Sequence, residues 1–141
     1  MKREEIKQIL PHREPMLLVD EATVNGNKAE GQYTVKGDEF FLQGHYPGMP
    51  VVPGVILCEM MAQVGALVVL SMEENKGKTP LFGGMDKVRF RRMVKPGDTL
   101  AVKCEITRTV GDLGFGKVEG FVGSEPACDA VITFALMKKE N

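Results

Sequence analysis

A long apolar segment that follows a rigid loop constrains this fold more than any other feature of the chain. Residues 55–70 read VILCEMMAQVGALVVL, and only Glu59 and Gln63 carry strongly polar side chains. A segment that is apolar on nearly all sides is typical of a helix enclosed by other structure. These sixteen residues, a Glu and a Gln among them, fall short of the roughly twenty apolar residues that a membrane span needs. We therefore expect a buried helix in a protein without membrane contact.

The loop before this helix is rich in glycine and proline and contains one histidine. Residues 44–54 read GHYPGMPVVPG, and six of these eleven are Gly or Pro. Both residue types fix turn-like conformations and interrupt helices and strands. The sequence therefore predicts a rigid loop that presents the imidazole of His45. Taken alone, His45 would be interpreted more plainly as a turn histidine bonded to a nearby carbonyl.

Glu59 and Gln63 are four residues apart, which places them on one face of the expected helix. There the Gln amide can hydrogen-bond the carboxyl group and fix its direction. A buried carboxyl group without a partner is costly, and catalysis is a common reason to keep one. We interpret Glu59 as a functional residue. The alternative is a core Glu satisfied by backbone donors.

Size and composition favour a single soluble domain over residues 1–141, because a chain of this length buries about two thirds of its unfolded surface in one core. Lys and Arg number 18 against 19 Asp and Glu, so nucleic-acid binding is not indicated. Three cysteines without a CxxC pair argue against a disulfide framework and fit a reducing compartment. The charged N-terminus lacks a secretory signal, and a cytoplasmic location is expected.

Hydrophobic periodicity predicts one short helix and several half-buried strands around the apolar helix. The expected elements are a helix at 3–10 and strands at 16–24, 28–35, 86–94, 99–110, 116–122 and 128–138. The simplest architecture is α+β, with a curved antiparallel sheet wrapped around a long central helix. A lone sheet of this kind leaves edges exposed, and pairing two copies would bury them. A homodimer is therefore the expected unit.

Several motifs together resemble the 3-hydroxyacyl-[acyl-carrier-protein] dehydratases of type II fatty acid synthesis, which have the hot-dog fold. The resemblance covers nearly the whole chain. It rests on Leu10-Pro11-His12-Arg13 with Leu17-Leu18-Val19-Asp20, Gly44-His45-Tyr46-Pro47-Gly48 with Val52-Pro53-Gly54, Glu59 with Ala62-Gln63, and Arg89-Phe90-Arg91-Arg92 before Pro96-Gly97-Asp98. It implies dehydration of 3-hydroxyacyl-[acyl-carrier-protein] to trans-2-enoyl-[acyl-carrier-protein] in fatty acid elongation. The implied partner is an acyl carrier protein, and the implied assembly is a trimer of dimers.

The resemblance also implies which residues form the site. His45 corresponds to the family's catalytic histidine, and Glu59 to its acidic partner, which the other subunit of the dimer normally supplies. On the substrate side we expect Gly54, whose N–H would hold the thioester carbonyl at a helix N-terminus, and Gln63. His45 would take the C2 proton, and Glu59, directly or through a bound water, would assist loss of the hydroxyl group. No metal or redox cofactor is required.

Other residues are assigned to structure or are left open. His12 is expected to bond backbone or neighbouring side chains without taking part in the chemistry. Cys58 adjoins Glu59, but neighbouring helical residues point about 100° apart, so a Cys58 and His45 nucleophile pair is disfavoured. The basic residues from Lys87 to Lys95 form either a solvated face or a surface that steers an acidic carrier protein. Met49, Met93 and Lys95 depart from the family pattern.

Two rival functions remain. The first is a hot-dog acyl thioesterase, in which an acidic residue activates water against the same carbonyl; the pairing of His45 with Glu59 disfavours it. The second is a noncatalytic acyl-binding module that keeps the fold, in which the polar residues would only orient a ligand. Appearance of a 2-enoyl thioester, seen by its ultraviolet absorbance, would separate dehydration from both.

Overall fold

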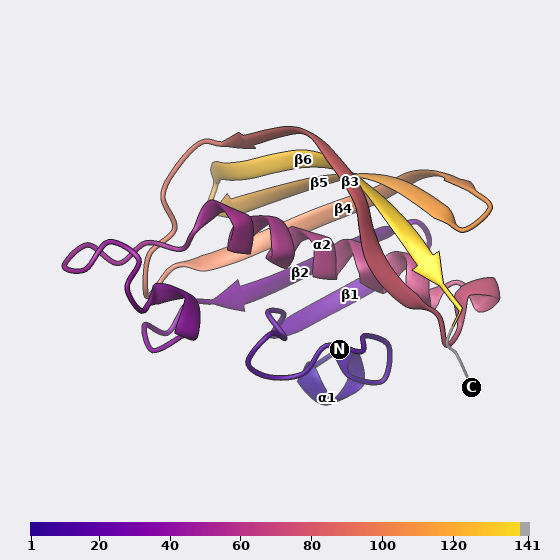
Figure 1. The fold of residues 1–141 in the computed structure, drawn as a ribbon, viewed down its shortest axis with the longest axis horizontal. Coiled ribbons are helices and arrows are strands. Elements are labelled where there is room, and N and C mark those ends of the chain that lie inside the picture. The colour runs from indigo at the N-terminus through magenta and orange to yellow at the C-terminus, as the bar shows by residue number, and fades with distance from the viewer. Residues whose placement is uncertain (139–141) are drawn as a thin grey trace.

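The protein is a curved six-stranded antiparallel sheet that wraps around one long helix (Figure 1). This computed structural model describes residues 1–138. The strands are β1 (Glu21–Asn25), β2 (Lys28–Thr34), β3 (Thr79–Phe90), β4 (Thr99–Val110), β5 (Leu113–Val122) and β6 (Glu125–Met137). Their order across the sheet is β1-β2-β4-β5-β6-β3. The expected α+β hot-dog architecture is confirmed.

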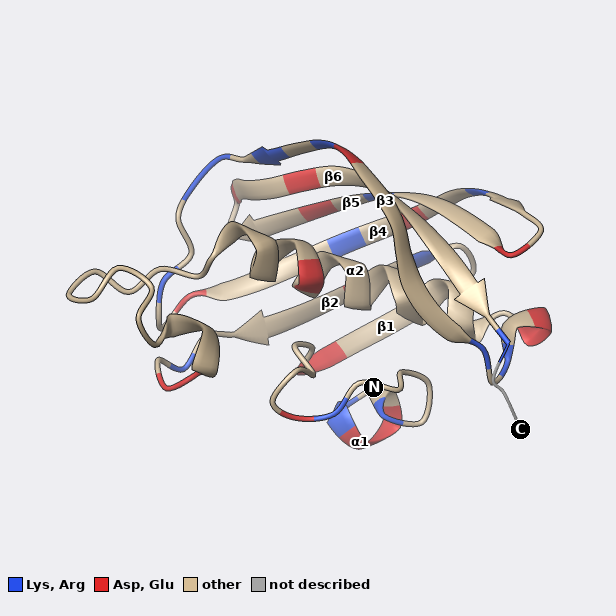
Figure 2. Ribbon diagram, in the orientation of Figure 1, with Lys and Arg blue, Asp and Glu red and all other residues tan. Residues whose placement is uncertain are grey.

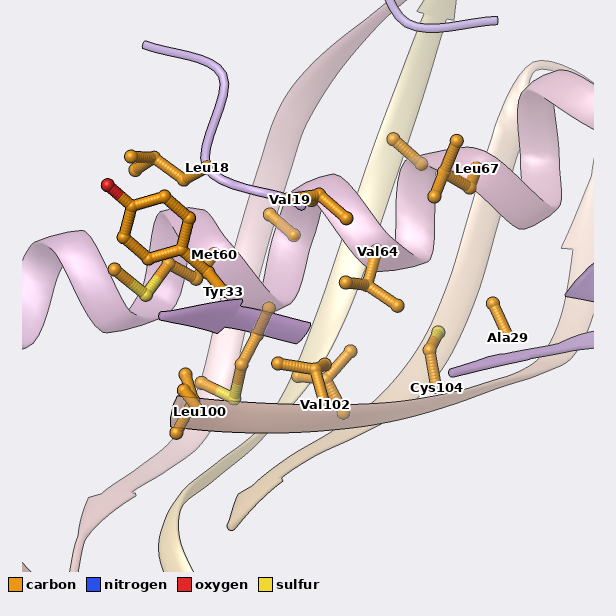
Figure 3. Close-up of a cluster of buried hydrophobic side chains, with 14 of the residues drawn as sticks. Leu18, Val19, Ala29, Tyr33, Met60, Val64, Leu67, Leu100, Val102 and Cys104 are labelled. Carbon is orange, nitrogen blue, oxygen red and sulfur yellow. The ribbon is translucent and has the colours of Figure 1, made fainter. Parts of the chain in front are cut away.

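The helix α2 (Gly54–Ser71) lies along the concave face of the sheet and fills it (Figure 1). Almost all of its residues from Met60 to Leu70 are completely buried, and the core beneath them is formed by the inward side chains of the strands. Figure 3 shows Val64 of α2 facing Val102 of β4 across this core. Figure 2 shows the helix almost free of charge. Its composition would suit a membrane span, but the sheet buries most of it.

The strand pattern follows from side-chain alternation and from turn chemistry. Inward positions of β4, such as Leu100 and Val102, are buried, whereas Lys103 points out to solvent. Such alternation is what a sheet with one wet face requires. β1 and β2 form the expected hairpin, in which Asn25 pairs with Lys28 and Gly26 takes a left-handed φ of +63°. That conformation favours glycine in a two-residue turn.

Four strand predictions were wrong at their boundaries. β5 and β6 each begin three residues before the expected positions 116 and 128. The first strand was expected at 16–24, but it begins at Glu21. Residues 17–19 are buried without pairing in the sheet because they cross α2, where the backbone N–H of Leu18 donates to the Gln63 side chain. The strand expected at 86–94 is instead β3 and begins seven residues earlier, at Thr79. The initial helix is also shorter than expected, since α1 spans Arg3–Ile6.

The prediction missed the first seven residues of β3, where the pairing register is interrupted. Its pairing with β6 shifts between Phe82 and Gly84 and again between Asp86 and Arg89. Within the second irregularity Lys87 has a left-handed φ of +53°. Each β-bulge reverses the side-chain alternation locally and bends the strand. β3 therefore curves across α2 instead of running straight (Figure 1).

The two edges of the sheet differ. β1 is covered at one end, where Lys2 forms a β-bridge with Glu21 and α1 packs nearby. Within residues 1–138, β3 has a hydrogen-bonded neighbour on one side only, and it exposes Leu81, Phe82 and Phe90. A long edge strand that exposes apolar side chains is a surface on which another strand can pair. The open edge of this fold is thus β3.

Candidate active site

The His45 imidazole is held by its own loop. Its Nδ1 lies 2.8 Å from the carbonyl oxygen of Val51. A carbonyl oxygen only accepts hydrogen bonds, so Nδ1 must carry the proton and donate it. In the neutral ring this leaves Nε2 with a free lone pair, which is the nitrogen that can act as a base. The bond agrees with the simpler interpretation of His45 as a turn histidine that bonds a nearby carbonyl. It is equally compatible with a catalytic imidazole.

The His45 loop is shaped around this ring by unusual backbone conformations. The Tyr46 ring lies against the imidazole, with ring centroids 4.2 Å apart and planes inclined by 30°. Tyr46 itself has a left-handed φ of +53°, and the glycines that flank it, Gly44 and Gly48, have φ of +79° and +88°. Left-handed conformations are costly for residues with a Cβ atom and are concentrated at functional sites. The His45 loop is therefore a candidate functional segment.

The Glu59 carboxyl group is fixed by Gln63, as the sequence predicts. Gln63 Nε2 donates to Glu59 Oε2 at 2.7 Å. The remaining groups of the Gln63 amide bond the backbone, because Oε1 accepts from the Leu18 N–H at 2.8 Å and Nε2 also donates to the Met16 carbonyl at 2.7 Å. Gln63 is buried, so the whole amide is committed to the protein.

Glu59 borders a cavity of about 210 Å³ between α2 and the first residues of β3. The polar side chains around it are those of Glu59, Gln63 and His12, and most of the remaining wall is apolar, including Leu81 and Phe82 of β3. A mainly apolar hollow with a few convergent polar groups is the usual form of a binding site. The sequence did not indicate Leu81 and Phe82, because the prediction placed the start of β3 beyond them.

His12 also reaches this cavity. Its Nε2 lies 3.4 Å from Glu59 Oε2, and its Nδ1 is buried without a hydrogen-bond partner among residues 1–138. The sequence placed His12 in a Pro-His-Arg motif and predicted contact with backbone or neighbouring side chains. The contact it makes is with the candidate catalytic carboxyl group itself. Only long-range packing of the N-terminal segment on α2 brings the two residues together.

Gly54 begins α2 beside the ring of Phe90. A Cβ atom at this position would come within 2.8 Å of that ring, so the site accommodates little more than glycine without a shift of Phe90. The preceding residue, Pro53, provides no side-chain cap. The first N–H groups of a helix lack partners inside the helix and carry a partial positive charge. Gly54 is thus suited to bind an oxygen that gains negative charge.

The cavity beside Glu59 does not contain all candidate residues of one chain. Glu59 and Gln63 border the cavity described above, whereas His45 does not border it. Met49, Met93 and Lys95, the three departures from the family pattern, instead gather around a separate hollow beside the His45 loop. Their positions in the sequence do not predict that these three residues line the same hollow.

Cys58 does not have the character of a nucleophile. The residue is half-buried on α2, and burial raises the pKa of its thiol above the ordinary value. A thiol must lose its proton to attack or to bind a metal, so a raised pKa makes it inert. The interpretation of Cys58 as a packing residue agrees with this environment.

Comparison with known proteins gives consistent results. Residues 10–130 match the model of the FabA-like domain family. The chain is 48% identical over 137 residues to the 3-hydroxyacyl-[acyl-carrier-protein] dehydratase FabZ of Natranaerobius thermophilus, covering 96% of each chain. It is 50% identical over 133 residues to the enzyme of the same name from Caldicellulosiruptor saccharolyticus, covering 93% of this chain and 95% of that one.

Solved structures agree on the fold. A chain of the dehydratase heterocomplex ApeI:P from Xenorhabdus doucetiae superposes with a TM-score of 0.81 at 22% identity, covering 95% of this chain and 91% of that one. A hypothetical thioesterase with coenzyme A from Streptococcus pneumoniae superposes with a TM-score of 0.66 at 18% identity, covering 86% and 88%. At these identities the structures establish only the shared fold. The family model and the full-length relatives go further: this chain belongs to the FabA-like family, among the FabZ 3-hydroxyacyl-[acyl-carrier-protein] dehydratases.

Proposed function

We propose that the protein dehydrates 3-hydroxyacyl chains carried by acyl carrier protein in the cytoplasm, using His45 of one protomer and Glu59 of its partner. The observation that carries this proposal is the Glu59 carboxyl group, aimed by Gln63 into an apolar cavity beside the open strand β3. An acyl chain requires apolar walls, and its elimination chemistry requires an acid and a base. The dehydratase activity of the protein's FabZ relatives matches this combination.

A homodimer formed through β3 would complete the site. β3 is the open edge, and its exposed Leu81, Phe82 and Phe90 would be covered by a second copy. Phe82 borders the Glu59 cavity, so a strand added there would bring partner residues close to Glu59. A twofold contact of this kind is self-complementary and would create two equal sites. A trimer of such dimers is the assembly expected from the resemblance.

His45 would act as the base in this reaction. In the neutral ring Nε2 is the unprotonated nitrogen, because Nδ1 donates to the Val51 carbonyl. Nε2 would remove the proton from C2 of the substrate while the thioester carbonyl oxygen gains negative charge. The N–H of Gly54, at the uncapped start of α2, would stabilise that oxygen. Glu59 would then assist the departure of the C3 hydroxyl group as water.

An acidic carrier protein would be attracted by the basic cluster formed by Lys87, Arg89, Arg91, Arg92 and Lys95. The structure divides this cluster into two groups. Arg91 pairs with Asp129 at 2.6 Å, and Arg92 pairs with Asp98 and Glu125. In the described part of the chain, Lys87, Arg89 and Lys95 form no ion pair, so these three carry the free charge that would steer a carrier.

Mixing two inactive variants tests the shared site. His45→Ala and Glu59→Gln should each lower kcat for a 3-hydroxyacyl thioester by about 10²–10⁴-fold, because each removes one proton-transfer group. When the two variants are unfolded and refolded together, half of the dimers should be mixed and hold one intact site of two. Activity should then recover to about a quarter of the parental value.

The assay follows the absorbance of the 2-enoyl thioester, with free thiol measured in parallel to detect thioester hydrolysis. Refolding each variant alone is the control for recovery that does not depend on mixing. Mixtures that stay inactive, although both chains fold and associate, would place both groups in one protomer. Full activity in either single variant would refute the assignment of that residue.

A further inference from the structure

His12 contacts the same carboxyl oxygen that Gln63 holds, although neither the proposed mechanism nor the family match gives it a role. Its Nε2 lies 3.4 Å from Glu59 Oε2, and the two side chains are 23% and 19% exposed. Both side chains come from one protomer, so their contact does not depend on dimer formation. This distance exceeds that of an ordinary hydrogen bond. Catalytic contacts are often long before substrate binds and shorten in the complex.

The hydrogen bonds around Gln63 show which Glu59 oxygen acts only as an acceptor. Gln63 Oε1 faces the Leu18 N–H, which can only donate, so Nε2 is the amide nitrogen that faces Glu59. Its two hydrogens go to the Met16 carbonyl and to Glu59 Oε2, both at 2.7 Å. Glu59 Oε2 therefore accepts a hydrogen bond and is a poor place for the proton of an acid.

The surroundings of His12 indicate which of its nitrogens carries the proton in the neutral ring. Nδ1 is buried and has no partner within residues 1–138, while Nε2 faces Glu59 Oε2. A proton on Nδ1 would leave a buried donor without an acceptor and would set the Nε2 lone pair against a carboxyl oxygen. A proton on Nε2 avoids both costs, because the donor then lies 3.4 Å from the carboxyl oxygen and the buried Nδ1 is left only as an unpaired acceptor.

We propose that His12 is a positioning residue that, together with Gln63, occupies Oε2 of Glu59 with donors and so directs the reactive proton to Oε1. In the described chain no hydrogen bond engages Oε1, which leaves this oxygen available to the departing hydroxyl group. His12 would act through Glu59 and would exchange no proton with the substrate. It would fix the rotation of the carboxyl group, and a misplaced acid costs rate even when substrate still binds. This inference rests on the proposed role of Glu59.

The first test compares His12→Leu with His12→Gln. Leucine removes the donor but keeps much of the volume, whereas the Gln side-chain nitrogen can occupy the place of Nε2. We expect His12→Leu to lower kcat roughly 10- to 100-fold with KM nearly unchanged. His12→Gln should recover most of that loss. A general base or acid at position 12 would not be replaced by Gln, so failure of Gln to rescue a folded protein would overturn the positioning role.

The second test combines His12→Leu with Glu59→Gln. A residue that acts through Glu59 should have little further effect once Glu59 is replaced, so the double variant should be within about 2-fold of Glu59→Gln alone. A loss that multiplies in the double variant would show that His12 acts independently and would refute the inference. Near-parental activity of Glu59→Gln alone would instead refute the proposed function. The two failures are therefore distinguishable.

Nitrogen NMR of the two histidines supplies a readout that does not depend on activity. The chain has only two histidines, so single substitutions assign their signals. We expect neutral His12 to carry its proton on Nε2, and Glu59→Gln to shift the His12 signals. Neutral His12 found with its proton on Nδ1 would contradict the proposal, and so would His12 signals that Glu59→Gln leaves unchanged. This measurement remains informative if His12→Leu folds poorly.

Discussion

The two halves of the proposed site are built in opposite ways. Glu59 lies on the buried helix α2. The Gln63 side chain that holds it is itself hydrogen-bonded to the backbone of Met16 and Leu18. His45 lies on a partly exposed loop, where one carbonyl and one neighbouring ring hold it. Groups on rigid elements are placed more accurately than groups on loops. The proposed acid, Glu59, is therefore positioned by the core, whereas the proposed base, His45, is positioned by local backbone conformation.

This contrast suits a site completed by two chains. The acid and its supports form within one protomer during folding, because their contacts belong to the core. The base is presented at the surface, where a partner can receive it. Substitutions beside Glu59 should consequently affect stability and activity together. Substitutions in the His45 loop should affect activity while leaving most of the stability intact.

Gln63→Leu should have the largest effect on stability. It leaves the Leu18 N–H and the Met16 carbonyl without their partner, and each buried unsatisfied group costs about 1–3 kcal/mol. We expect the free energy of unfolding to fall by about 2–5 kcal/mol in urea titrations. Gln43→Leu is the matched control beside the His45 loop, because Gln43 is exposed, and it should change stability by less than about 0.5 kcal/mol. Equal losses of stability in Gln63→Leu and Gln43→Leu would contradict the view that only the Glu59 side of the site depends on the core.

Gly48→Ala should reveal the opposite behaviour. Gly48 has a φ of +88° and no neighbouring atom within 4 Å of an added Cβ, so an alanine there meets strain but no clash. The strain amounts to about 1–2 kcal/mol, and the loop can relieve it by moving His45. We expect kcat to fall about 10-fold through this displacement, with a stability loss of no more than about 1–2 kcal/mol.

Gly123→Ala is the control for Gly48→Ala. Gly123 lies in the turn between β5 and β6, has a φ of +62° and likewise has open space around it. Its substitution should lower the free energy of unfolding by a similar amount and leave kcat unchanged. If both variants keep parental activity, the backbone of the His45 loop does not have to be rigid for catalysis.

The sequence predicted those parts of the fold that depend on local pattern. β4 was predicted with its observed boundaries, because Leu100, Val102 and Cys104 alternate with polar residues. α2 was predicted to within one residue at each end, because Gly and Pro precede it and its apolar run is long. The bond between Gln63 and Glu59 followed from helical spacing alone. These features require no knowledge of distant segments.

The features that sequence analysis missed all depend on contacts between segments far apart in the chain. Residues 17–19 have the composition of a strand, but Leu18 bonds a helix side chain instead of a neighbouring strand. The bulges in β3 disturb the alternation by which a strand is recognised. The approach of His12 to Glu59 spans 47 positions of sequence. Local periodicity carries no information about contacts between such distant segments.

The smallest effect should be seen in the thiol reactivity of the cysteines in the protein core. Cys104 and Cys128 are buried, and burial raises the pKa of each thiol to about 12. At pH 8 only about one in ten thousand of these thiols is ionised, and reagents attack the ionised form. We expect a disulfide reagent to leave both unlabelled in native protein over minutes, with slow labelling at the half-buried Cys58, whose pKa is also raised.

All three thiols should react at once in denaturant, which provides the control for reagent and stoichiometry. In Gln63→Leu, a core loosened around α2 should admit the reagent to Cys104, which packs against Gly65, sooner than in the parent. In Gly48→Ala the labelling rate should match that of the parent, because the loop lies outside the core. Faster labelling of Cys104 in the loop variant would show that the two halves of the site are coupled through α2.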